Sequence, residues 1–160
     1  MSTPLSLRNN GGNLVNELGF VDVNKSTLQH VRYSNVFALG DCANSPNSKT
    51  AAAVAAQSYV VFKNLSAVME GRLAYQSYEG YSSCPIVTGY SSCVLTEFDY
   101  TMQPMEFFPF DQAKERLSMF PLKRDILPFI YWHLMMNGSW NGPPIFIRNV
   151  LKLLKQIVFK

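Results

Sequence analysis

Charged residues are scarce in this sequence: they make up 16% of its 160 residues, against about a quarter in ordinary soluble proteins. Hydrophobic residues reach 48%, which excludes an intrinsically disordered chain, because disorder requires low hydrophobicity and high charge. The net charge of +3 comes without a dense cluster of Lys and Arg before the C-terminus. A nucleic-acid-binding function, which needs clustered cations to neutralise phosphates, is therefore not indicated.

Metal-site spacings, targeting patterns and long apolar runs are also missing. The three cysteines, Cys42, Cys84 and Cys93, lack metal-ligand spacing, so we predict no metal site. Their odd number, without a secretory signal, predicts free thiols. Residues 1–12 match neither a signal peptide nor a transit peptide. The sequence contains no run of about 18 apolar residues, so we predict no membrane-spanning helix.

The clearest local pattern that is present is an apolar run followed by an alanine-rich segment. Residues 36–40 are apolar on both faces, which is typical of a strand buried in a parallel sheet, although a buried helical segment gives the same pattern. Residues 50–69 predict a helix, since neither Gly nor Pro interrupts them. Ser48 or Thr50 is the expected N-cap, and Gly71 is the expected C-terminal stop.

This arrangement suits a ligand at the end of the predicted strand. Open α/β sheets bind ligands at the carboxyl ends of their strands, where Gly40 and Asp41 lie. The helix that begins near Thr50 directs partial positive charge at such a ligand, and Lys49 would add a full charge. For a flavin, Asp41 would accept a hydrogen bond from a ribityl hydroxyl. An ordinary strand–helix unit in which Asp41 caps a turn explains the same residues, because a lone Gly-Asp motif is weak.

The second half of the sequence combines alternating and helical patterns. Alternation beyond residue 71 predicts antiparallel strands near residues 85–88 and 94–100. Three helices are then expected, over residues 110–120, 122–136 and 145–160.

Several segments together resemble one family of flavoproteins. Residues 36–42 resemble the second flavin-contacting motif of two-dinucleotide-domain flavoproteins, in which the aspartate binds the ribityl chain. Residues 48–57, 81–90 (YSSCPIVTGY), 97–100 and 108–119 resemble the mitochondrial-type sulfide:quinone oxidoreductases more particularly. The resemblance covers most of the chain.

The resemblance implies an incomplete FAD-binding, two-domain flavoprotein fold of the α/β class, which is α+β as a fragment. It implies a loose N-terminus with a remnant of the second dinucleotide-binding domain over residues 1–35, and a strand–helix unit completing the FAD-binding domain over residues 36–71. A C-terminal interface region follows over residues 72–120, and membrane-facing amphipathic helices over residues 121–160. The sequence contains no G-x-G-x-x-G motif for the pyrophosphate of FAD. We therefore expect an N-terminal half of the enzyme to be missing and the isolated chain to be inactive.

The resemblance also implies that Cys84 is one of two redox cysteines. In the family, hydrogen sulfide attacks the cysteine pair, and one cysteine holds the added sulfur as a persulfide. Electrons then pass through FAD to ubiquinone, and an acceptor thiol or sulfite removes the sulfur. By composition alone, Cys84 is equally well a small buried hydrophobic residue. A quinone-reducing NADH dehydrogenase is disfavoured, because hydride transfer from a nicotinamide needs no such thiol.

Apolar and cationic residues predict that the C-terminal region faces a membrane. Residues 145–160 combine a broad apolar surface with a border of Lys and Arg, which suits a helix lying in the interface of an anionic bilayer. The implied location is the periphery of the mitochondrial inner membrane. Packing on the missing domains or an oligomer contact would explain the same surface, and a non-catalytic membrane- or partner-binding fragment is the alternative function. The aromatic residues expected to anchor the protein or line a quinone route are Phe107, Phe108, Phe110, Phe129, Trp132 and Trp140.

Overall fold

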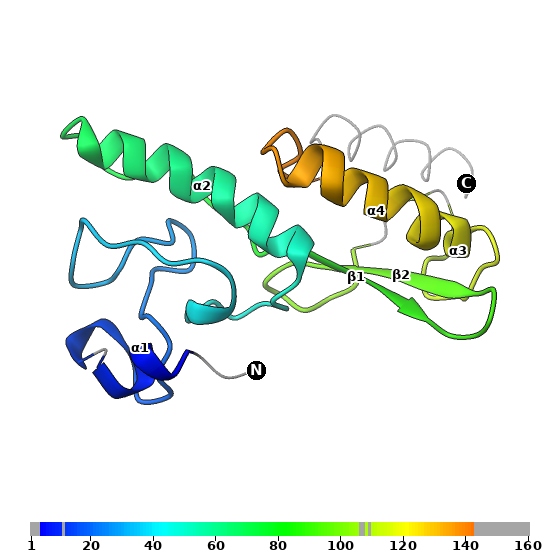
Figure 1. Ribbon diagram of the computed structural model, residues 1–160, viewed down its shortest axis with the longest axis horizontal. Coiled ribbons are helices and arrows are strands. Elements are labelled where there is room, and N and C mark those ends of the chain that lie inside the picture. Colours follow the sequence, from blue (N-terminus) through cyan, green and yellow to red (C-terminus); the bar gives the residue numbers. More distant parts are fainter. Residues whose placement is uncertain (1–3, 11, 106–107, 109, 143–160) are drawn as a thin grey trace.

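The computed structural model describes residues 4–10, 12–105, 108 and 110–142, which form a small α+β fold (Figure 1). A long helix, a two-stranded antiparallel sheet and a helical C-terminal segment are its main parts. The helix predicted over residues 145–160 lies outside the described residues. In chain order the elements are α1 (Leu5–Asn10), η1 (Gly12–Leu14), η2 (Gly40–Cys42), α2 (Ala51–Met69), β1 (Ser82–Val87), β2 (Cys93–Phe98), α3 (Met119–Pro121), η3 (Leu122–Ile126), α4 (Leu127–Ile130) and η4 (Tyr131–Met135).

Helix α2 begins and ends as the sequence predicts. Thr50 is its N-cap, and the Thr50 hydroxyl accepts a hydrogen bond from the Ala53 amide at 3.2 Å. Gly71 takes a φ of 76° just beyond the other end. There the amide of Arg72 donates to the carbonyl of Ala67 at 2.8 Å, the bond that characterises a Schellman C-cap.

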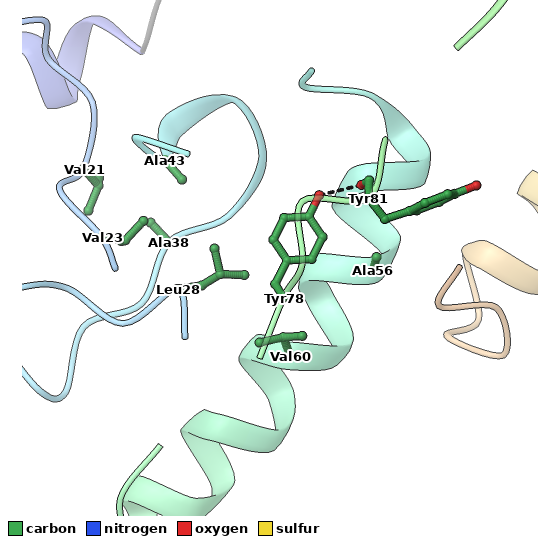
Figure 2. Packing of buried hydrophobic residues seen from close by; sticks show 9 residues of the cluster. All are labelled: Val21, Val23, Leu28, Ala38, Ala43, Ala56, Val60, Tyr78 and Tyr81. Carbon is green, nitrogen blue, oxygen red and sulfur yellow. Dashed lines mark hydrogen bonds between the residues drawn. The ribbon is translucent and has the colours of Figure 1, made fainter. Parts of the chain in front are cut away.

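The hydrophobic core lies between α2 and the irregular segments on either side of it in sequence (Figure 2). Ala56 and Val60 of α2 pack in the same cluster as Leu28 and Tyr78. Tight local turns before α2 bring the apolar side chains of residues 21–43 to this face. The buried members of the cluster are Val21, Val23, Leu28, Ala38, Ala43, Ala56, Val60, Tyr78 and Tyr81.

The strand predicted over residues 36–40 is wrong. Phe37 makes one isolated antiparallel bridge with Gln29, and the chain then turns into η2. A strand of a parallel sheet needs neighbouring strands, and the part of the chain that the structure describes pairs this segment through that single bridge. The α+β description is therefore confirmed, whereas the expected parallel strand is not.

The predicted antiparallel region is confirmed. Strands β1 and β2 pair from Ser82 with Phe98 to Val87 with Cys93, so β1 begins three residues before the predicted start at residue 85. Along β2 the burial alternates, with every second residue buried. One face of the hairpin is therefore packed against the rest of the protein.

The helix predicted over residues 110–120 is wrong, because a long-range pairing replaces it. The amide of Arg116 donates to the Cys93 carbonyl at 3.1 Å, and the amide of Cys93 donates to the Arg116 carbonyl at 3.4 Å. The backbone of this segment thus bonds to the start of β2 instead of to its own preceding turn. The helix predicted over residues 122–136 is confirmed, and it starts at Met119 with stretches of π-helix. None of the helices in the described ranges is long and apolar enough to cross a bilayer.

Candidate functional site

The turn η2 is held against the first half of α2. The amide of Gly40 donates to Oε1 of Gln57 at 2.7 Å. Gly40 has a φ of 66°, and a Cβ built on it would lie 3.2 Å from Cγ2 of Val54. Both the backbone conformation and the close approach of turn and helix therefore favour glycine at this position. Asp41, the next residue, is exposed, so its carboxylate is accessible to a ligand.

Lys49 folds back onto this turn. Its Nζ donates to the carbonyls of Asp41 and Ala43, each at 3.0 Å. The same atom lies 3.8 Å from the centre of the Phe20 ring. Burial lowers the pKa of Lys49, and the nearby Asp41 carboxylate opposes that shift. The ammonium thus holds the turn in shape, while a direct contact of Lys49 with a cofactor stays a prediction.

The N-terminal end of α2 adds the second part of the site. A helix leaves its first amide groups without intrahelical partners and carries partial positive charge there. Thr50 satisfies one of them, the amide of Ala53. Ala51, the first residue of the helix, is exposed, and Ala52 packs partly buried against the core. The structure therefore gathers Gly40, Asp41, Lys49 and Thr50 around one helix end, as the sequence predicts.

Cys84 lies on β1, and its thiol is exposed. Its backbone pairs with Thr96 of β2, whose hydroxyl donates to the Cys84 carbonyl. The alternative prediction, that Cys84 is a small buried hydrophobic residue, is wrong. Both β1 and η2 contact α2, and the start of β1 lies beside the N-terminal end of α2 (Figure 1). The strand that carries the thiol therefore begins next to the helix end described above.

The other two cysteines have different surroundings. Cys93 is buried, and burial raises the pKa of its thiol, against the opposing charge of Lys123. The thiol of Cys42 is partly buried and donates to the Leu39 carbonyl at 3.2 Å. Neither thiol is freely accessible, and a reactive cysteine requires access. Cys84 is the exposed cysteine of the three.

The predicted aromatic residues lie in two separate places. The first is a stacked pair that precedes the C-terminal helices in sequence. The rings of Phe108 and Phe110 stack with their centres 5.2 Å apart. The guanidinium of Arg116 lies 4.5 Å from the centre of the Phe110 ring. Phe107 lies outside the described residues.

The remaining aromatic residues are on or after the C-terminal helical segment. Phe129 and Trp132 are exposed on it, whereas Trp140 packs partly buried against the hydrophobic core. A separate, open apolar depression of about 420 Å³ lies at the tip of the hairpin. None of the predicted site residues lines it; the lining residues are Val87, Gly89, Tyr90 and Phe120.

Sequence reasoning missed Gln57, whose amide oxygen anchors Gly40. Gln57 is 1% exposed, although the next residue, Ser58, is exposed. The available signal was a single amide among alanines, which a surface position explains equally well. No group of His, Cys, Asp and Glu among the described residues is arranged to hold a metal ion.

The chain is similar to curated enzymes over most of its own length. No family model matches it. It is 53% identical over 135 residues to the mitochondrial sulfide:quinone oxidoreductase of Mus musculus, a match that covers 84% of this chain and 30% of the relative. It is 49% identical over 126 residues to the mitochondrial sulfide:quinone oxidoreductase of Dictyostelium discoideum, covering 78% of this chain and 27% of the relative.

A solved structure shares the fold. The match is a chain in the cryo-EM structure of the Tetrahymena thermophila mitochondrial ATP synthase, an F1Fo composite tetramer, with a TM-score of 0.73 and 27% identity. It covers 84% of this chain and 33% of that chain.

These similarities identify the class of protein: the chain is part of an oxidoreductase lineage. More particularly, the chain belongs to the sulfide:quinone oxidoreductase family. It spans less than a third of the length of the curated relatives that it matches.

Proposed function

We propose that this chain supplies the C-terminal part of a mitochondrial, FAD-dependent sulfide:quinone oxidoreductase, with Cys84 as a redox cysteine. One observation carries the proposal. The exposed thiol of Cys84 lies on a strand that starts beside the helix end where Gly40, Asp41 and Thr50 gather. The names of the relatives supply hydrogen sulfide and a quinone as the substrates, and ubiquinone is the quinone that we propose.

The charge and shape of the helix end suit the ring end of FAD. When bound, FAD supplies two-electron redox chemistry. The positive end of α2 would stabilise negative charge on the ring edge. Asp41 would accept a hydrogen bond from a ribityl hydroxyl, and Gly40 would allow close approach of the backbone. Lys49 contributes by holding the carbonyls of Asp41 and Ala43. The pyrophosphate end of FAD would be held by the part of the enzyme that carries a glycine-rich motif.

Cys84 provides the sulfur chemistry in this proposal. A hydrosulfide ion attacks a disulfide between Cys84 and a second redox cysteine outside this chain. The new sulfur–sulfur bond forms a persulfide on one cysteine, the old bond breaks, and the other cysteine leaves as a thiolate that carries the electron pair. An acceptor thiol or sulfite then attacks the outer sulfur and regenerates the first thiolate. The two thiolates would re-form the disulfide by giving up one electron pair, for which bound FAD and then the quinone would be the acceptors.

A chimaera tests the enzyme proposal. The matching segment of the mouse relative is replaced by this chain, and FAD absorbance and sulfide-dependent quinone reduction are measured. We expect bound FAD and turnover in the chimaera. We expect Cys84→Ser to keep FAD but lose turnover by about a thousandfold or more, because it removes one sulfur of the disulfide that hydrosulfide attacks. Cys93→Ala is the matched control and retains both, and substantial turnover by the Cys84→Ser chimaera would contradict the proposal.

The isolated chain gives a second, independent test. Because it contains no glycine-rich pyrophosphate motif, we expect it neither to retain FAD nor to oxidise sulfide. FAD that stays bound at a one-to-one ratio through gel filtration would contradict this expectation.

We also propose that the C-terminal helical segment rests on the surface of the mitochondrial inner membrane. Ile126, Phe129, Trp132 and Met136 expose large apolar side chains along it, and a peripheral enzyme needs such a surface to reach a lipid-soluble quinone. Flotation with anionic liposomes measures the association. A chain that stays in the soluble fraction with and without lipid would contradict it.

A non-catalytic, partner-binding fragment is the second candidate. The observation that favours it is the match over 84% of this chain, at a TM-score of 0.73, to a chain in a structure of a large mitochondrial assembly. The chimaera separates the two candidates. A well-folded chimaera that binds FAD without any sulfide-dependent turnover favours the partner-binding role.

A further inference from the structure

The hydroxyl of Tyr78 is the centre of a buried hydrogen-bond network. Tyr78 is 3% exposed. Its hydroxyl accepts from Nδ2 of Asn47 at 2.8 Å. It donates to the carbonyl of Tyr81 at 2.5 Å (Figure 2). Burial raises the pKa of Tyr78 well above its ordinary value, and the side chain of Gln57, which adjoins the hydroxyl, opposes that shift. The hydroxyl thus keeps its proton and joins two segments by one accepted and one donated hydrogen bond.

One arm of the network reaches the candidate cofactor turn. Gln57 is 1% exposed, and its Oε1 accepts the amide of Gly40 at 2.7 Å. The same side chain adjoins the Tyr78 hydroxyl. Asn47 lies in the loop that leads to Lys49 and the start of α2. Tyr78 therefore contacts both segments that border the proposed flavin position.

The other arm reaches the hairpin that carries the thiol. Tyr81 directly precedes β1, and its hydroxyl donates to Oε1 of Glu97 at 2.8 Å. Glu97 is 7% exposed and pairs with Ser83 across the hairpin. Nε2 of Gln112 lies 3.5 Å from Oε2 of Glu97. Cys84 is three residues beyond Tyr81 on the same strand.

We propose that Tyr78 is a positioning residue that couples the turn at Gly40 to the strand of Cys84. Its catalytic meaning rests on the proposed function, since that function needs the thiol to be held close to the flavin ring. Buried hydrogen bonds hold their partners in one geometry, because an unpaired buried donor or acceptor is costly. Misplacement of reacting groups by about 1 Å is enough to slow a reaction strongly.

The substitution Tyr78→Phe tests the coupling because it keeps the ring and removes only the hydroxyl. In the full chain, hydrogen exchange of the Gly40 amide is measured by NMR, and alkylation of Cys84 by iodoacetamide is measured by peptide mass spectrometry. We expect each rate to change by about tenfold, as the loss of buried hydrogen bonds implies. Tyr75→Phe is the matched control, because Tyr75 is exposed, and we expect it to change neither rate.

A merely structural role of Tyr78 gives a different result. Global destabilisation would speed the exchange of the amides of residues 61–69 in α2 as much as that of Gly40. That outcome, or a change at only one of the two ends, overturns the proposal. Glu97→Gln keeps an acceptor for Tyr81 and is expected to preserve both rates, whereas Glu97→Leu is expected to alter the alkylation of Cys84.

The chimaera with the mouse relative then connects the network to catalysis. We expect Tyr78→Phe to lower kcat about tenfold with FAD still bound and KM for sulfide little changed, because positioning acts on the reacting state. An unchanged kcat overturns the catalytic part of the inference. A chimaera without any turnover, in which Gly40 and Cys84 still respond together to Tyr78→Phe, instead rejects the proposed function and leaves the coupling standing.

Discussion

Helix α2 and the C-terminal helical segment are both rich in apolar residues, yet they differ in what covers them. Both are helical over several turns, and α2 is fully α-helical, whereas the C-terminal segment alternates between α- and π-helix. None of the residues in that segment, from Met119 to Met135, is buried. The buried residues of α2 are Ala53, Ala56, Gln57, Val60, Asn64 and Ala67.

The difference shows where each helix obtains its stability. The buried side chains of α2 have apolar and hydrogen-bonding partners within the protein. Its two buried amides, Gln57 and Asn64, are both hydrogen-bonded. The C-terminal segment keeps Phe129 and Trp132 more than half exposed, at 58% and 66%. An apolar surface of this kind is available to lipid or to another protein. Substitutions in α2 should therefore lower the stability of the fold, whereas substitutions in the C-terminal segment should weaken its association with lipid or another protein.

The largest loss of stability is expected from Gly80→Ala, in the packed segment between α2 and β1. A Cβ on Gly80 would lie 2.5 Å from Cγ and 2.6 Å from the backbone nitrogen of Tyr100, and φ is 86°. We expect the free energy of unfolding in urea to fall by about 3 kcal/mol or more. Gly71→Ala shares the positive φ of 76° but meets nothing within 4 Å, and should cost about 1 kcal/mol. Equal costs would contradict the close packing around Tyr100.

The next largest effect is expected from Asn64→Ala, which removes a buried amide of α2. Its Nδ2 donates to the carbonyls of Thr27 and Gln76, and its Oδ1 accepts the amides of Tyr75 and Gln76, all within 2.8–2.9 Å. We expect a loss of about 2–3 kcal/mol in urea unfolding, because these backbone groups are left unpaired. Ser58→Ala, on the exposed face, should stay within about 0.5 kcal/mol. If Asn64→Ala also changed the free energy of unfolding by no more than about 0.5 kcal/mol, water would have to replace the hydrogen bonds of the amide.

A smaller effect is expected at alkaline pH from the partly buried phenol of Tyr100. Burial raises the pKa of Tyr100 from 10.0 to about 12. In the unfolded chain the phenol ionises near pH 10.0, while the folded protein keeps its proton, so the folded state binds more protons and loses stability as pH rises towards about 12. Urea unfolding as a function of pH should show a shallower decline for Tyr100→Phe. Tyr90→Phe, at a ring in open solvent, should leave the decline unchanged.

The smallest effect on stability is expected from Phe129→Ser in the C-terminal segment. Because Phe129 is exposed, we expect a change within about 0.5 kcal/mol in urea unfolding, together with weaker flotation with anionic liposomes. Val60→Ala in α2 is the contrasting variant and should cost about 2 kcal/mol without changing flotation. A comparable loss of stability in both variants would remove the distinction between the two regions.

Local patterns predicted the helix and the hairpin but failed where partners are distant in sequence. Thr50 and Gly71 mark the ends of α2 through bonds within a few residues, so their roles were visible in the sequence. The helical pattern of residues 110–120 was overridden by the pairing of Arg116 with Cys93. The apolar run at residues 36–40 lacks the strand neighbours that its pattern requires, and it turns into η2 instead.

The candidate site was predictable in its residue types and less so in its contacts. The sequence predicted that Gly40, Asp41 and Thr50 would meet at one helix end, since a short turn joins them. It did not predict that Lys49 folds back onto the carbonyls of Asp41 and Ala43. A long flexible side chain can reach a ligand or its own turn, and only the position of the turn decides between them.

The sequence by itself determined α2, the antiparallel hairpin and the membership of the chain in its family, because local backbone preferences and extended identity are properties of neighbouring residues. Only the tertiary structure decided that Cys84 is exposed while Cys93 is buried, and that Tyr78 joins Asn47 to Tyr81. Burial and hydrogen bonding of these groups depend on which segments pack together across long loops, and no local pattern records that packing.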